Sequence, residues 1–200
     1  MVSKGRAASD VRAAYQAGQV AFGESYVQEA LPKQRLLSDC HIEWHFIGRL
    51  QSNKTRAVAT HFDWVHSVDC LRIAERLSQQ RPSDAAPLNL CLQVDLCDEG
   101  QKGGVSPDAL LTLAQEVNAL DSVVLRGMML IPRQALGGHA LQQIFREAHR
   151  LWLELKRVVP TADTLSMGMS NDYVQAIAAG STLVRVGRAV FEPPAGCDVR

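Results

Sequence analysis

Short apolar runs alternate with amphipathic segments along the whole chain, and this alternation limits the possible folds more than any other feature. Apolar runs of four to eight residues indicate buried strands, and apolar stripes spaced by three or four residues indicate helices. No Asn-Gly hairpin signal joins successive runs. Eight strands are predicted, at residues 1–4, 20–22, 42–47, 64–67, 88–94, 123–130, 164–167 and 183–186.

Strands separated by helices are typical of parallel βα units, with strands that are apolar on both faces. The sequence therefore predicts an α/β fold, a (β/α)8 TIM-type barrel, with a doubly wound sheet as the second choice. A chain of 200 residues with 46% hydrophobic residues fits a single domain over residues 1–200. The first strand is short, and we expect the chain to lack a preceding helix.

The segment 164–191 combines two strand ends with glycines, hydroxyls and a helix start. Gly168 breaks the first of these strands, Ser170 begins a helix with Val174 and Ile177 on one face, and Gly187 ends the second strand. Free backbone N–H groups in such turns favour phosphate, and the last two βα loops are the usual phosphate site of a barrel. The alternative is an ordinary helix-to-strand connection ended by a glycine cap.

Two basic residues at strand ends are candidates for chemistry. Lys4 ends the first predicted strand at the mouth of the barrel, where a desolvated lysine forms a Schiff base, although a lysine near a chain start is usually solvated. Arg185 interrupts an apolar strand and points inward if the strand alternates, so it needs an acceptor, either a carboxylate or a ligand atom.

His41, Glu43 and His45 alternate along one strand and resemble a zinc ligand triplet. Middle residues of a barrel strand must also fill the interior, and no cysteine or second acidic cluster accompanies them, so we predict no metal. Asn53 follows this strand in a polar loop at the end of the barrel where active sites lie, and it either lines the site or caps a helix.

Charge and cysteine content exclude several classes of partner. Lys plus Arg and Asp plus Glu both number 21, without long blocks of one sign, which argues against nucleic acid or an anionic membrane. The five cysteines are odd in number and show no CxxC pairing, as expected for reduced thiols in a cytoplasmic protein. We find no signal peptide and no apolar run long enough for a membrane span.

The segments VSK, FGESYVQEA, EWHFIGRLQSNK, LRGMMLIP, LSMGMSNDY and AAGSTLVRVGRAVF resemble, in order and spacing, the pyridoxal phosphate homeostasis proteins. These are single-domain relatives of the alanine racemase N-terminal barrel, and the match covers essentially the whole chain. The resemblance implies a fold-type III barrel that binds pyridoxal 5'-phosphate (PLP) as an aldimine on Lys4. It further implies cofactor-binding roles for His45, Asn53, Ser166, Gly168, Ser170, Arg185 and Gly187, with Arg185 at the pyridine nitrogen and the serines and glycines around the phosphate.

The resemblance implies a carrier or buffer that contributes to PLP and amino-acid homeostasis, not a turnover enzyme, because an arginine at the ring nitrogen weakens the electron sink. The partners expected are PLP and small amino acids, for a monomer or weak dimer. Two alternatives remain: a racemase-like PLP enzyme acting on amino acids, and a phosphate-ligand barrel without PLP.

The chain departs from the family pattern at its start and at three positions. The family begins with a helix and a longer first strand before VSK, so we expect a truncated or alternative start and an incompletely closed barrel. Ser25 replaces an asparagine, Arg188 a threonine and Glu192 a glycine of the family pattern. The loss of that threonine removes one hydroxyl from the expected phosphate site.

Overall fold

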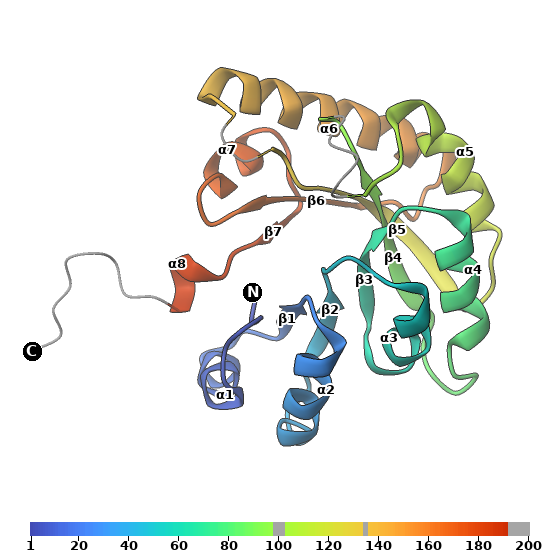
Figure 1. The fold of residues 1–200 in the computed structure, drawn as a ribbon. Coiled ribbons are helices and arrows are strands. Elements are labelled where there is room, and N and C mark those ends of the chain that lie inside the picture. The colour runs from blue at the N-terminus through green and yellow to red at the C-terminus, as the bar shows by residue number, and fades with distance from the viewer. Residues whose placement is uncertain (98–102, 134–135, 192–200) are drawn as a thin grey trace, which may run out of the picture.

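The computed structural model describes residues 1–97, 103–133 and 136–191 (Figure 1). Its strands are β1 (Ala21–Glu24), β2 (Glu43–Phe46), β3 (Trp64–Val68), β4 (Leu88–Val94), β5 (Val123–Leu130), β6 (Thr164–Met169) and β7 (Leu183–Arg185). Its helices are α1 (Ala8–Gln16), α2 (Val27–Leu36), the short 3-10 helix η1 (Ser52–Lys54), α3 (Thr55–His61), α4 (Leu71–Gln80), α5 (Pro107–Asn118), α6 (Gly138–Val158), α7 (Tyr173–Ala178) and α8 (Arg188–Phe191).

The seven described strands form one parallel sheet in the order of the sequence, from β1 to β7. Helices connect successive strands and lie around the outside of the curved sheet (Figure 1). The longest pairing joins β4 and β5, from Leu88 opposite Val123 to Val94 opposite Leu130, with one register shift between Leu90 and Cys91. The predicted α/β barrel of parallel strands is therefore confirmed. Because the strands are parallel, the C-terminal ends of the described strands all lie at one edge of the sheet, which we call the C-terminal edge.

The first residues of the chain join the two ends of the sheet. Val2 forms a parallel bridge with Gly23 of β1, and its backbone N–H donates to the carbonyl oxygen of Val186, just after β7, at 2.8 Å. The predicted first strand at residues 1–4 is reduced to this bridge, because the chain turns at Lys4 and Gly5, where Gly5 has φ of 70°. We call the junction of β7, Val2 and β1 the seam.

Most of the apolar core lies between the strands and the surrounding helices. Leu90 and Leu92 of β4 pack there with Leu110 of α5 and Phe145 of α6. The barrel interior is different, because its apolar content centres on a small cluster of Trp64, Cys91 and Met129. Polar side chains occupy much of the remaining interior: His45, His66, Gln93, Ser166 and Arg185 are all buried.

Two details of segment 164–191 differ from the sequence-based expectation. The strand does not break at Gly168 but continues to Met169. Gly168 adopts φ of 97°, and the register of the β6–β7 pairing shifts between Ser166 and Met169. The helix that follows buries Ala176, while Val174 and Ile177 are exposed. A Cβ at Gly168 would lie 2.7 Å from the Cβ of Ala176, so the glycine lets α7 pack on its alanine.

Candidate cofactor site at the seam

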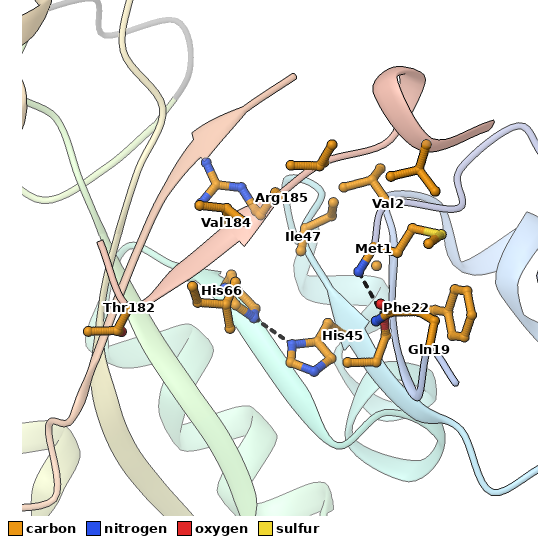
Figure 2. Close-up of a pocket in the computed structure, with 15 residues that line it drawn as sticks. Met1, Val2, Gln19, Phe22, His45, Ile47, His66, Thr182, Val184 and Arg185 are labelled. Carbon is orange, nitrogen blue, oxygen red and sulfur yellow. Dashed lines mark hydrogen bonds between the residues drawn. The ribbon is translucent and has the colours of Figure 1, made fainter. Parts of the chain in front are cut away.

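A chain of hydrogen bonds crosses the barrel interior from β2 to β7. Glu43 Oε1 lies 2.7 Å from His45 Nε2, and His45 Nδ1 lies 2.8 Å from His66 Nε2 (Figure 2). The bonds continue from His66 Nδ1 to Ser166 Oγ at 3.0 Å, and Arg185 Nη1 donates to the same Ser166 oxygen at 2.7 Å. Strands β2, β3, β6 and β7 therefore each contribute to one connected network.

Strand alternation brings these side chains together. Successive side chains of a strand point to opposite faces, so Glu43 and His45 share one face of β2, while Trp44 and Phe46 belong to the outer apolar core. His45 is paired in register with Trp64 of β3, and the two rings stack with centroids 5.2 Å apart and planes within 7°. His45 is thus fixed both by its hydrogen bonds and by the indole beneath it.

Arg185 is a buried cation held by neutral groups. Its side chain donates to Ser166 Oγ and, at 2.8 Å, to the carbonyl oxygen of Leu130, which uses two of its five N–H groups. Burial lowers the pKa of the guanidinium to about 10, so it remains charged at neutral pH; Asp172 favours that charge from a distance. No carboxylate forms an ion pair with Arg185 in the described part of the chain, and a buried charge of this kind suits a ligand acceptor.

A cavity of about 370 Å³ opens beside this network, between β1 and β7 (Figure 2). Its volume falls within the range of small-molecule sites. His45, His66 and Arg185 supply polar groups to its wall, and the remaining wall is largely apolar: Met1, Val2, Ala21, Phe22, Gly23, Ile47, Leu183, Val184, Val186 and Val190 all line it, with Gln19 and Thr182.

A second group of polar atoms lies at the C-terminal edge of the seam. The hydroxyl oxygen of Ser170 accepts long hydrogen bonds from the backbone N–H groups of Gly187, at 3.4 Å, and Ala189, at 3.5 Å. A Cβ at Gly187 would lie 3.0 Å from the carbonyl oxygen of Val2, so glycine permits the close approach of this turn to the start of the chain. A hydroxyl beside converging N–H groups is a suitable arrangement for a phosphate.

The structure divides seven of the eight predicted site residues into three groups and places Gly168 apart from them. His45, Ser166 and Arg185 share the interior network, whereas Ser170 and Gly187 meet in the edge turn. Lys4 and Asn53 are exposed at the same C-terminal edge, in the turn after Ser3 and in η1 respectively. The remaining predicted residue, Gly168, supports the packing of α7.

His66 was missed by the sequence analysis, although it is central to the network. The signal for it was the alternation of Trp64 and His66 on β3, next to the strand that carries His45. Of the zinc-like triplet, Glu43 and His45 bond to each other, while the backbone N–H of exposed His41 donates to Tyr15 Oη. No group of three metal-ligating side chains occurs among the residues that the structure describes.

The model of one protein family, "Alanine racemase, N-terminal domain", matches residues 3–193. Pyridoxal phosphate homeostasis proteins of Haemophilus influenzae and Pseudomonas aeruginosa are 47% and 50% identical to this chain. Each alignment covers 95% of this chain, with 82% of the first relative and 81% of the second. In the described residues, no helix is both long and apolar enough to cross a membrane.

Solved structures agree with these relatives. PipY of Synechococcus elongatus with PLP bound matches with a TM-score of 0.88 and 41% identity, over 95% of this chain and 90% of PipY. Alanine racemase of Corynebacterium glutamicum matches over 98% of this chain and 56% of its own, with a TM-score of 0.71 and 17% identity, a likeness of fold alone. The chain belongs to the pyridoxal phosphate homeostasis family, whose barrel is that of the alanine racemase N-terminal domain.

Proposed function

We propose that this chain binds PLP at the seam and carries or buffers it without turnover. The observation that carries the proposal is Arg185, a buried cation with no carboxylate in ion-pair contact among the described residues, at the wall of a cavity of about 370 Å³. A ligand with a heteroaromatic nitrogen and a phosphate satisfies both this cation and the N–H groups at the edge turn. The PLP bound by PipY supports the choice of ligand.

The phosphate belongs, in this proposal, at the turn of Ser170, Gly187 and Ala189, where backbone N–H groups already converge on one hydroxyl. Ser166 has a different role from the one first expected, because its hydroxyl is engaged by Arg185 and His66. It supports the arginine at the ring nitrogen and leaves the phosphate to the edge turn.

Lys4 is the proposed covalent attachment point. It lies in the turn directly after Ser3, whose backbone N–H donates to Gly23 at 2.9 Å, and Val2 contacts the Gly187 turn. When bound, PLP supplies an aldehyde that condenses with an amine, with loss of water, and a ring that withdraws electrons. Lys4 Nζ provides the amine, and Asn53 is a further polar group at the same edge.

Arg185 also explains the proposed lack of turnover. A guanidinium whose pKa is lowered only to about 10 keeps its own proton at neutral pH and does not transfer it to the pyridine nitrogen. An unprotonated ring is a weaker electron sink, which favours storage of the cofactor over carbanion chemistry. Cys40, Cys70, Cys91 and Cys97 are free thiols, consistent with the proposed cytoplasmic location. Small amino acids remain the proposed exchange partners, for a monomer or weak dimer.

Titration with PLP, followed by absorbance and by equilibrium dialysis, tests the two contacts separately. Lys4→Ala should abolish the imine absorption while the protein still retains PLP or pyridoxamine phosphate non-covalently. Ser170→Asp should lose PLP even with Lys4 intact, because two like charges about 4 Å apart repel by about 4 kcal/mol at an effective dielectric of about 20.

Asn171→Asp is the matched control for Ser170→Asp, since it adds the same charge at a neighbouring exposed position. It should bind PLP nearly as the wild type does, and Lys54→Ala should keep the imine absorption. Wild-type protein that binds no PLP would refute the proposed function. Exchange of deuterium at the α-carbon of amino acids would instead favour a racemase-like enzyme.

A further inference from the structure

Only one assignment of hydrogen-bond donors and acceptors fits the whole network from Glu43 to Arg185 when Glu43 is ionised. An ionised carboxylate only accepts hydrogen bonds, so His45 must donate through Nε2–H to Glu43 and accept through Nδ1. His66 must then donate through Nε2–H to His45 and accept through Nδ1 from the hydroxyl of Ser166. The Ser166 oxygen keeps its lone pairs for Arg185, which donates to it. Each polar atom along this path has a compatible partner.

Glu43 is held in its ionised form at the start of the path. Its pKa is lowered first by the hydrogen bond from His45, while burial opposes this, and His45, Trp64 and Arg126 contribute further lowering. The indole N–H of Trp64 has no hydrogen-bond partner within the described residues, and its dipole helps to lower the pKa of Glu43. The Glu43 side chain is 48% exposed, so this end of the path reaches solvent.

His66 is held neutral in the middle of the path. It is fully buried, and burial is the first cause of a pKa well below the ordinary histidine value. The groups that face it are His45 on β2, Ser166 on β6, Arg185 on β7 and the amino group of Met1. His45, Arg185 and the Met1 amino group each disfavour a positive charge on His66. A neutral His66 carries one N–H, and the path determines on which nitrogen it lies.

We propose that Glu43, His45, His66 and Ser166 are positioning residues that fix the Arg185 guanidinium through a hydrogen-bond relay with one tautomer at each histidine. The acceptor-only carboxylate of Glu43 selects the Nε2–H form of both histidines, which leaves Ser166 as a hydroxyl donor to His66. A hydroxyl that donates becomes a better acceptor, so its bond from Arg185 is strengthened.

The network with every donor and acceptor reversed holds one more proton, which it takes from solvent. In that state Glu43 is a carboxylic acid that donates to His45 Nε2, and each histidine has its proton on Nδ1. His66 then donates to Ser166 Oγ, whose lone pairs are shared between His66 and Arg185, and the arginine is held less firmly. The ionised state of Glu43 therefore determines how tightly a residue on β7 is held.

Nitrogen NMR of the protein without cofactor, labelled with ¹⁵N at histidine, tests the relay directly. Wild-type His45 and His66 should both show the Nε2–H pattern at neutral pH, whereas exposed His41, His61 and His139, which lie outside the network, should show no single tautomer. A predominant Nδ1–H form of His45 or His66 would overturn the proposal.

Glu43→Gln is the informative variant, because its amide has the same shape but both donates and accepts. It should convert both buried histidines to a mixture of tautomers, an effect that loss of packing alone does not produce. Glu116→Gln on α5 is the control and should leave both patterns unchanged. A Glu43→Gln protein that keeps the single Nε2–H form would also overturn the proposal.

The effect on ligand binding rests on the proposed function, so it forms a separate arm of the experiment. Glu43→Gln should weaken PLP binding by about fivefold, the scale of one weakened hydrogen bond, and Glu116→Gln should not. Absence of PLP binding in the wild type would refute the proposed function but leave the NMR result intact. Unchanged affinity in Glu43→Gln with altered tautomers would refute the positioning of Arg185.

Discussion

The sheet is continuous at one side and barely joined at the other. In the wall formed by β3, β4 and β5, seven register pairs join β4 to β5 and three join β3 to β4. At the seam, β7 and β1 are joined through Val2, with one hydrogen bond to Val186 and one bridge to Gly23. The wall is packed on leucines, whereas the seam contains a cavity and buried charges.

The comparison shows that the cavity and the Arg185 end of the polar network lie where Val2 joins the two ends of the sheet. The outer faces of the described wall strands are filled by apolar side chains, and their inner faces combine the cluster of Trp64, Cys91 and Met129 with buried His66 and Gln93. The seam instead holds Arg185 on one strand and the ion pair of Glu24 with Lys33 beside the other. Stability should therefore depend on apolar volume at the wall and on charge pairing at the seam.

The largest expected effect is at the buried ion pair of the seam. Glu24 is fully buried, accepts from Lys33 Nζ and from Ser3 Oγ, and has its second oxygen unpartnered among the described residues. Lys33→Met leaves this charge uncompensated and should lower the free energy of unfolding by about 4 kcal/mol in urea denaturation. Adding Glu24→Gln should restore part of the loss. If Lys33→Met costs no more than exposed Lys156→Met, the seam does not depend on this pair.

The next effect concerns the wall. Leu90 on β4 is fully buried in the outer core, so Leu90→Ala removes packed volume and should cost about 3 kcal/mol, measured by the same denaturation. Leu36 on α2 is 67% exposed, and Leu36→Ala should change stability by only about 0.5 kcal/mol. Equal costs for the two variants would contradict the account of the wall.

A pH dependence arises from His66 beside the seam. Its folded-state pKa lies well below the unfolded value, so the unfolded chain binds more protons below about pH 6.5. Stability should fall as pH decreases from about 6.5, with a slope of up to about 1.4 kcal/mol per pH unit from this group. His66→Gln should flatten that slope between about pH 5 and 6.5, and exposed His61→Gln should not. An unchanged slope in His66→Gln would assign the dependence to another group.

The smallest expected effect is from lengthening the strand at the seam. Four added residues of alternating apolar type before Met1 should pair with the backbone edges of β1 and β7, to which Met1 and Val2 already bond. We expect a gain of about 1 kcal/mol, or about 3 °C in the melting temperature of a chain of this size. A Gly-Ser extension of equal length is the control. A matching rise in both proteins would mean that strand pairing is not the cause.

The sequence predicted the wall better than the seam. The residue bounds of β4 and β5 were predicted correctly, because long runs rich in branched apolar residues have few alternatives to a buried strand. The strand at residues 1–4 and the buried face of α7 were predicted incorrectly. An isolated bridge at Val2 and a helix of six residues are both too short to show a reliable periodicity. Close packing through Gly168 decided the orientation of α7.

The candidate site was predicted in part for a similar reason. The inward position of Arg185 followed from strand alternation, and the place of Gly187 in the edge turn followed from the end of its strand. The partner relation between His45 and His66 depends on the register of two strands, which no local pattern determines. Glu43 was visible as a polar residue, but its role became clear only from its contact with His45.

Borohydride reduction of the PLP-loaded protein, followed by peptide mapping, tests the central claim most directly, because reduction fixes the cofactor on whichever amine carried the imine. The account predicts one pyridoxyl group, on Lys4 in the turn that follows Ser3. A label on Lys54 or Lys102, or on no lysine, would contradict the assignment of the seam as the cofactor site.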